Sequence, residues 1–140
     1  MSKVAVVYWS GTGNTAAMAS AVEAGAKDRG AEVTVFGPES FTAAKVAEFD
    51  GIAFGCPAMG AEVLEESSYE PMFTEVESAL SGKKIALFGS YGWGDGQWMR
   101  DWEDRCNAVG ARLVCESVMA NNAPGADDLD ACKSLGAALA

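Results

Sequence analysis

The sequence has no histidine, and it has only 10 basic residues against 20 acidic ones. The absence of histidine removes Ser-His-Asp and Cys-His hydrolase sites from consideration, together with mixed Cys/His metal sites. A formal net charge of −10 argues against nucleic acid as a partner, because its phosphates need Lys and Arg. The same charge favours solubility and a partner with a basic docking surface.

Long apolar runs and paired cysteines are also missing. No apolar run approaches the roughly 18 residues that suggest a membrane span, so we expect no membrane partner. The four cysteines, Cys56, Cys106, Cys115 and Cys132, form no Cys-x-x-Cys pair, so we expect free thiols in a reducing compartment. The start of the chain, 1–3, leads directly into a strand pattern, so we expect no signal peptide and a cytoplasmic protein. Residues 1–140 suit a single domain with one core.

Apolar, β-branched segments alternate with helical patterns along the whole chain. Strands are predicted at Lys3–Trp9, Glu32–Phe36, Gly51–Gly55, Lys84–Gly89 and Arg112–Val118. Helices are predicted at Thr15–Arg29, Phe41–Phe49, Pro71–Leu80, Gln97–Val109 and Ala126–Ala140. This alternation predicts an α/β fold with a parallel sheet and right-handed crossovers. Ligands of such sheets bind beyond the carboxyl ends of the strands, so the loops 10–15, 56–65 and 90–98 should converge on one site.

The first of these loops is polar, small and free of cations. Ser10-Gly11-Thr12-Gly13-Asn14-Thr15 offers three hydroxyls, one side-chain amide and two glycines. Glycine has no Cβ to forbid positive φ, so such a loop can curl with its N–H groups pointing inward. Backbone N–H groups, hydroxyls and the start of a helix can together hold a phosphate. We therefore predict a phosphate-bearing cofactor.

Other readings of the same loop are weaker. Gly11, Gly13 and Ala16 satisfy the dinucleotide fingerprint, but the extra hydroxyls, the short chain and the lack of a ribose acid after the second strand count against NAD. A P-loop needs a Lys that this loop does not have. A plain turn without a ligand remains an alternative.

The second and third loops offer apolar groups that suit a flat ring. Pro57-Ala58-Met59-Gly60 makes a tight turn with an exposed thioether, although a lone Met is often core filling. Ser90-Tyr91-Gly92-Trp93-Gly94 alternates aromatic residues with glycines, and Trp93 is the best stacking candidate. Trp98 and Trp102 lie four residues apart on a predicted helix, so we assign them to the core.

Taken together, the three loops resemble those of short-chain flavodoxins of the anaerobic bacterial type. Residues 10–15 resemble the family's phosphate loop, residues 57–60 and 89–94 resemble its two flavin-flanking loops, and the similarity spans the chain from Val4 to the last helix. The resemblance implies a doubly wound five-stranded parallel sheet of order 2-1-3-4-5 with helices on both faces. It implies a monomeric, low-potential one-electron carrier that binds FMN non-covalently and exchanges electrons with redox proteins.

The resemblance also implies roles for individual residues. The phosphate would be held by Ser10, Thr12, Gly13, Asn14 and Thr15, with Ser90 nearby as a further hydroxyl donor. Met59 and Trp93 would cover the two faces of the ring, the Gly60 carbonyl would face flavin N5, the Glu62 carboxylate would accept from N3–H, and the Gly92 N–H would face the pyrimidine edge. The cofactor-binding set is completed by Gly11, Pro57, Ala58, Ala61, Tyr91 and Gly94.

The acidic stretch between Glu62 and Glu77 has two interpretations. No Lys or Arg interrupts the run of Glu62, Glu65, Glu66, Glu70, Glu75 and Glu77, which is either a solvated face or a docking rim for a basic partner.

Two other functions on a similar fold are weighed against the electron carrier. A flavin-dependent NAD(P)H:quinone reductase would need an insertion or an Arg/Lys cluster, and we find neither. A receiver domain would need an Asp at the end of a central strand, whereas the third strand ends in 55–57, Gly-Cys-Pro.

Overall fold

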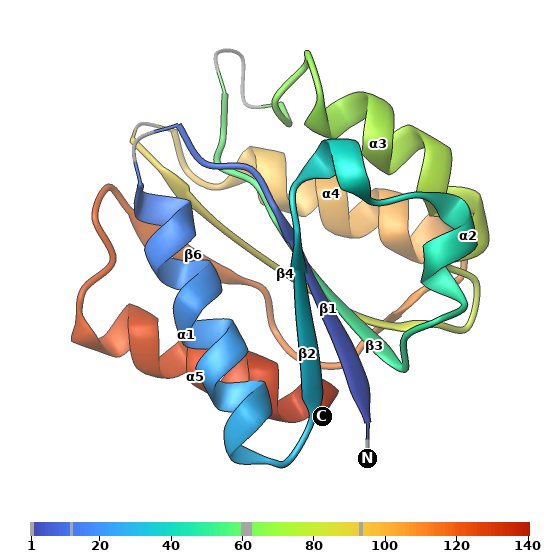
Figure 1. Ribbon diagram of the computed structural model, residues 1–140. Helices are drawn as coiled ribbons and strands as arrows, with labels where there is room; N and C mark the ends of the chain where they lie inside the picture. The colour runs from blue at the N-terminus through green and yellow to red at the C-terminus, as the bar shows by residue number, and fades with distance from the viewer. Residues whose placement is uncertain (1, 12, 60–62, 93) are drawn as a thin grey trace.

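The computed structural model describes residues 2–11, 13–59, 63–92 and 94–140, which form strands and helices in alternation (Figure 1). The strands are β1 (Lys3–Tyr8), β2 (Glu32–Phe36), β3 (Gly51–Gly55), β4 (Lys84–Tyr91), β5 (Arg112–Leu113) and β6 (Val118–Asn121). The helices are α1 (Asn14–Asp28), α2 (Ala43–Val46), α3 (Tyr69–Val76), α4 (Gln97–Ala108) and α5 (Ala126–Leu139), with 3₁₀ turns at Pro38–Ser40 and Glu77–Ala79.

The pairings between these strands are all parallel, in the order β2-β1-β3-β4-β5, with β6 also beside β4. This confirms the doubly wound fold and the strand order. The chain moves outward in one direction from β1 to β2 and in the other from β1 to β3, so the winding reverses at β1 and β3. Loops that leave the carboxyl ends of these two strands flank the crevice where such sheets bind ligands.

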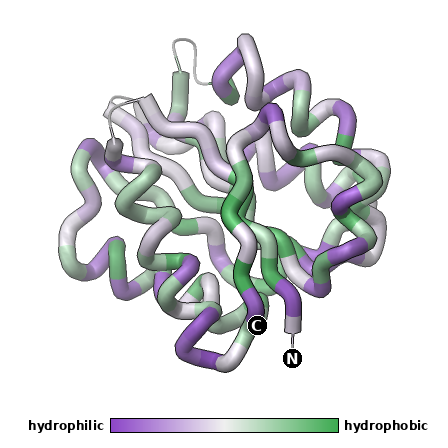
Figure 2. The backbone as a smooth tube through the Cα atoms, viewed as in Figure 1, coloured by the Kyte–Doolittle hydropathy of each residue, from purple (hydrophilic) through white to green (hydrophobic). Residues whose placement is uncertain are grey.

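Alternate residues of the central strands supply the two halves of the core, because successive strand side chains point to opposite faces. One half packs against α1 and α5 and receives Val4, Val6, Ala53, Ala86 and Phe88. The other half packs against α2, α3 and α4 and receives Ala5, Val7, Ile52, Phe54, Ile85 and Leu87. Figure 2 shows the hydrophobic central strands against hydrophilic outer turns. Trp98 and Trp102 are buried in the second half, which confirms their assignment to the core.

The predicted fifth strand, Arg112–Val118, is wrong as a continuous element. It is split into β5 and β6, and the residues between them leave the ladder. Three steps along β4, from Ile85 to Phe88, correspond to five steps from Leu113 to Val118, so this edge strand carries extra residues. Ser117 Oγ donates a 2.7 Å hydrogen bond to Glu103 of α4, which holds the excursion against the helix.

Other boundaries differ less. The predicted helix at 41–49 shrinks to α2, and the one at 71–80 begins two residues earlier and ends as a 3₁₀ turn. β4 extends beyond Gly89, because Ser90 and Tyr91 pair with Ala120 and Asn121 of β6. Within the described ranges, no helix has the length and apolarity needed to span a bilayer.

Candidate functional site

A cleft of about 240 Å³ lies at the carboxyl ends of the strands. All three loops singled out in the sequence contribute to it, so their convergence is confirmed. The lining residues are Trp9, Gly11, Asn14, Pro57, Ala58, Met59, Ser90, Tyr91, Gly92 and Asn122. None of them is charged, and most of them are apolar or small.

The start of α1 presents backbone donors at one side of this cleft. Gly13 precedes the helix with φ 96°, a conformation that favours glycine, and no acidic residue lies in the first turn. Ser10 Oγ accepts hydrogen bonds from the N–H groups of Gly13 (3.1 Å) and Ala16 (3.2 Å). Within the described part of the chain, the N–H groups of Asn14 and Thr15 have no acceptor. These two donors, together with the unused hydroxyl proton of Ser10, fit a phosphate without any cationic side chain.

Ser90 joins the first loop to the second. Its hydroxyl lies 3.2 Å from Thr15 Oγ1, and both side chains are buried. Whichever of the two hydroxyls donates, the other keeps a proton for a further acceptor. The Ser90 carbonyl accepts a 3.0 Å hydrogen bond from the Ala58 N–H, so the same residue fixes the start of the second loop.

The apolar side of the cleft rests on a close approach of β3 and β4. A Cβ at Gly89 would lie 2.2 Å from the carbonyl oxygen of Cys56, so only glycine fits there. The indole N–H of Trp98 donates to the same carbonyl at 3.2 Å, and the Trp98 and Tyr91 rings lie 5.5 Å apart. The buried Trp98 thus contacts Tyr91, which lines the cleft, and Cys56, which precedes the lining residue Pro57.

The structure places most of the predicted cofactor residues at the cleft. Beyond those that line it, Ser10 and Gly13 precede α1, Thr15 lies in its first turn, and Gly94 lies within the third loop with φ 88°. Thr12, Gly60, Ala61, Glu62 and Trp93 lie outside the described residues.

Sequence reasoning missed two lining residues, Trp9 and Asn122. Trp9 directly follows β1, and Asn122 directly follows β6. Asn122 adopts φ 60°, which Asn tolerates, and its N–H donates a 2.7 Å bond to the Tyr91 carbonyl. The strand-end rule points to Trp9 at the end of the first strand, but the predicted fifth strand ends at Val118, so the rule does not reach Asn122, which follows β6 only in the structure.

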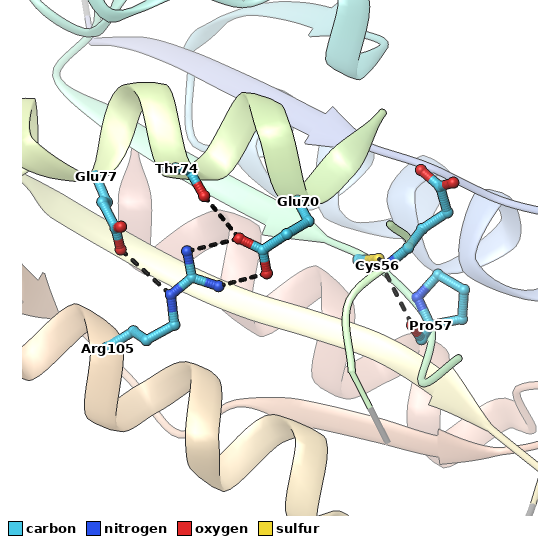
Figure 3. Close-up of polar contacts among 7 residues, drawn as sticks. Cys56, Pro57, Glu70, Thr74, Glu77 and Arg105 are labelled. Carbon is cyan, nitrogen blue, oxygen red and sulfur yellow. Dashed lines mark hydrogen bonds and ion pairs between the residues drawn. The ribbon is translucent and has the colours of Figure 1, made fainter. Parts of the chain in front are cut away.

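Three of the six acidic residues of this stretch, Glu65, Glu70 and Glu77, are engaged within the protein, and its role as a docking rim stays a prediction. Glu70 and Glu77 form ion pairs with Arg105 of α4 at 2.7 and 3.2 Å, as Figure 3 shows. Arg105 also lies over the Phe73 ring, 4.9 Å from its centroid. The basic residue that this stretch lacks in sequence is therefore supplied by Arg105 from another helix.

Glu65 is the third member, and only 6% of it is exposed. Its carboxylate accepts hydrogen bonds from Ser67, Ser68 and Tyr69 at the start of α3. Burial alone would raise the pKa of Glu65, but these hydrogen bonds outweigh it and lower the pKa from 4.5 to about 2. Glu66 and Glu75 remain exposed.

The cysteines are free, as predicted, and Cys56, Cys106 and Cys132 are buried. Burial raises the pKa of the Cys56 thiol to about 12, so it is not a thiolate at neutral pH. In the part of the chain that the structure covers, no three His, Cys, Asp or Glu side chains gather as metal ligands.

A doubly wound sheet with backbone donors at the start of α1 and an uncharged cleft beside them defines a mononucleotide-binding α/β protein. Comparison with known proteins narrows this class. The flavodoxin family model matches residues 6–136, and the chain belongs to the flavodoxin family. Members of this family are FMN-binding electron carriers and not enzymes, which confirms the predicted cofactor and function.

The individual relatives agree with this assignment. The chain is 48% identical to a flavodoxin of Megasphaera elsdenii over 98% of both chains. It is 44% identical to a flavodoxin of Clostridium beijerinckii over 96% of this chain and 97% of that one. The solution structure of two-electron reduced Megasphaera elsdenii flavodoxin superposes with a TM-score of 0.89 over 97% of both chains.

Proposed function

We propose that the start of α1 holds the phosphate of FMN and that the cleft beside it holds the ring. The N–H groups of Asn14 and Thr15, which have no acceptor among the described residues, support the first half of this proposal. The spare protons of Ser10 and of the Thr15–Ser90 pair add donors, and Thr12 adds another by its sequence position. A helix N-terminus carries roughly half a positive charge, which stabilises an anion where no Lys or Arg lines the site.

The ring side of the site is proposed from the cleft walls and the sequence motifs together. Met59 lines the cleft and would lie against one ring face, with Trp93 assigned to the other. Gly60, Glu62 and Gly92 are assigned to the polar edge of the ring. The small or apolar side chains of Pro57 and Ala58 exclude water from the remaining wall.

The charge of the chain favours a low reduction potential. When bound, FMN supplies a ring that takes up and releases electrons one at a time. Coulomb's law gives about 1–2 kcal/mol between two unit charges about 10 Å apart at an effective dielectric constant of about 20. With a net charge of −10 and no described cation lining the cleft, negative charge added there is disfavoured, so the last reduction step moves to lower potential.

Titration of the flavin-free full chain with FMN tests this proposal. The observation that carries it is the pair of N–H donors at the start of α1 for which the described residues offer no acceptor. We therefore expect FMN fluorescence to be quenched at one equivalent and riboflavin, which lacks the phosphate, to bind far more weakly. A redox titration should then place the last step below that of free FMN. A colourless preparation that leaves FMN fluorescence unchanged would contradict the proposal.

We also propose that the chain acts as a cytoplasmic monomer and delivers electrons to proteins with basic docking surfaces. The net charge supports such partners, because opposite charge raises association rates. The exposed carboxylate of Glu66 is available for this role, and that of Glu75 is exposed but accepts a 3.1 Å hydrogen bond from the Ala43 N–H. The carboxylates of Glu65, Glu70 and Glu77 are engaged within the protein.

A further inference from the structure

The loop from Cys56 to Glu65 is closed at its base by hydrogen bonds between its two arms. Glu65 N–H donates to Cys56 Sγ at 3.4 Å. Met59 and Val63 exchange N–H···O hydrogen bonds of 2.9 and 3.1 Å, so the arms also pair nearer the tip. The position of Met59 in the cleft therefore depends on where both ends of this loop are held.

The first end is anchored to the sheet. Cys56 N–H donates to the Phe88 carbonyl at 3.1 Å, and Ala58 N–H donates to the Ser90 carbonyl at 3.0 Å. Both bonds continue the β3–β4 contact beyond the end of β3. This arm is fixed by backbone pairing and needs no particular side chain.

The second end depends on one carboxylate. Glu65 receives hydrogen bonds from the N–H and hydroxyl groups of both Ser67 and Ser68 and from the Tyr69 N–H. The Tyr69 hydroxyl in turn donates a 2.8 Å bond to the Val7 carbonyl of β1. The carboxylate thus ties the returning arm of the loop to α3 and, through Tyr69, to the strand that leads into the phosphate loop.

The hydrogen bonds to the Glu65 carboxylate make this residue hard to replace. Every hydrogen bond to the two carboxylate oxygens comes from a donor group, so only a side chain with two acceptor oxygens satisfies all of these donors. A Gln would direct its amide hydrogens at one set of these donors. Glu66, the adjacent residue, is exposed and has no hydrogen bond of this kind in the described structure.

We propose that Glu65 is a positioning residue for the ring side of the cofactor site: its carboxylate holds the returning arm of the 56–65 loop and thereby the place of Met59. This inference rests on the proposed FMN site. It assigns to Glu65 an effect on ring binding and on the reduction potentials, and none on phosphate binding.

The test compares Glu65→Gln with Glu66→Gln, which removes the same charge from the next residue. We expect Glu65→Gln to weaken riboflavin and FMN by the same factor, about fivefold to thirtyfold, because only contacts to the ring are lost. We also expect it to change the spacing between the two reduction potentials of the FMN-loaded protein. Glu66→Gln should leave both affinities within about twofold.

A third variant separates positioning from a general loss of stability. Leu135→Ala empties part of the core on the opposite face of the sheet, where Leu135 packs with α1. It should lower the melting temperature while leaving the spacing of the potentials unchanged. If Glu65→Gln fails to fold, Ser68→Ala, which removes one hydroxyl donor to the carboxylate, should produce a smaller change in the same direction.

The outcomes are distinct. Equal ring affinity and equal potentials in Glu65→Gln and the unmodified chain would overturn the positioning role. So would identical effects of Glu65→Gln and Glu66→Gln, since these would reflect charge alone. An unmodified chain that binds neither FMN nor riboflavin would instead overturn the proposed function.

Discussion

Two hollows lie at opposite ends of the sheet, and they differ in size and chemistry. The cleft at the carboxyl ends measures about 240 Å³, and its described lining residues are uncharged. The groove at the amino ends is larger, about 630 Å³, and is lined by Ser2, Asp50, Ser81, Gly82, Lys83, Lys84 and Arg112. The larger hollow is the less suited to a flat cofactor, because it offers no aromatic wall.

The contrast shows how the few cations of the chain are distributed. Lys84 and Arg112 are register neighbours on β4 and β5 at the amino end, and Lys83 donates to the Phe49 carbonyl at 2.6 Å. Among the described residues, none of these three cations has a carboxylate within ion-pair distance. Nearer the carboxyl end, Arg100 and Arg105 are both paired with acidic residues. None of the lining residues described for the cleft is a cation.

The largest expected effect is on the free energy of unfolding. It compares the buried carboxylate of Glu65, near the carboxyl ends of the strands, with the exposed carboxylate of Asp50 at their amino ends. The depressed pKa of Glu65, about 2 against 4.5, corresponds to about 3 kcal/mol of stability. This contribution is complete above about pH 4.5 and is lost as the pH falls through the folded-state pKa. We expect Glu65→Gln to lower the free energy of unfolding at pH 7, measured with urea, and its curve to converge on that of the unmodified chain near pH 2.

Asp50→Asn at the amino end is the control for that measurement. Asp50 is exposed, and its carboxylate accepts one hydrogen bond, from the Lys3 N–H at 2.8 Å. Its replacement should cost no more than about 1 kcal/mol. A pH-independent effect of Glu65→Gln would show that the carboxylate is not held ionised by its donors.

The next effect compares serines at the two ends. Ser10→Ala leaves the Gly13 and Ala16 N–H groups without their acceptor and removes the spare hydroxyl proton, so it should weaken FMN about tenfold or more and riboflavin hardly at all. Ser81→Ala in the amino-end groove should change neither affinity. Isothermal titration of both variants with both flavins checks this, and an equal loss for riboflavin would place Ser10 outside the phosphate site.

A cation added to the cleft should raise the last reduction potential, because it offsets part of the negative charge around the site. Asn122→Lys places a positive charge at the lining and should raise the last reduction potential by roughly 40–80 mV, the equivalent of about 1–2 kcal/mol for one electron. Asn122→Gly is the matched control, because glycine accepts the φ of 60° without adding charge. Lys84→Gln at the far end should shift the potential much less, and an equal shift would mean that the location of charge is irrelevant.

The smallest effect concerns partner association. Electron transfer to a basic redox protein should slow as salt rises from about 0.01 to 0.1 M, because the Debye length falls from about 30 to 10 Å. Glu66→Gln should reduce the rate at low salt by less than about twofold, and Lys84→Gln should leave it nearly unchanged. A rate that does not respond to salt would remove electrostatic steering from the account.

Local patterns in the sequence predict the central features of this molecule because short segments determine them. The apolar runs of β1 and β3, the glycines of the first loop and the helical spacing of Trp98 and Trp102 all carry their own signal. The split of β5 from β6 depends on register with β4 and on the Ser117–Glu103 contact, which no local pattern shows.

The acidic stretch illustrates the same limit. Arg105, which pairs with Glu70 and Glu77, lies about a helix and a strand away in sequence, so a one-dimensional charge count misses it. The rules for helix starts place the capping side chain at Ser68, which makes no capping hydrogen bond to α3, so they do not identify Glu65.

The most direct test of the account is a ¹H–¹⁵N correlation spectrum of the full chain recorded with FMN and with riboflavin. If backbone donors at the start of α1 hold the phosphate, the amide resonances of Asn14 and Thr15 will shift strongly with FMN and little with riboflavin, while those of Lys83, Lys84 and Arg112 stay in place. FMN-specific shifts at those three cationic residues, with Asn14 and Thr15 unmoved, would contradict it.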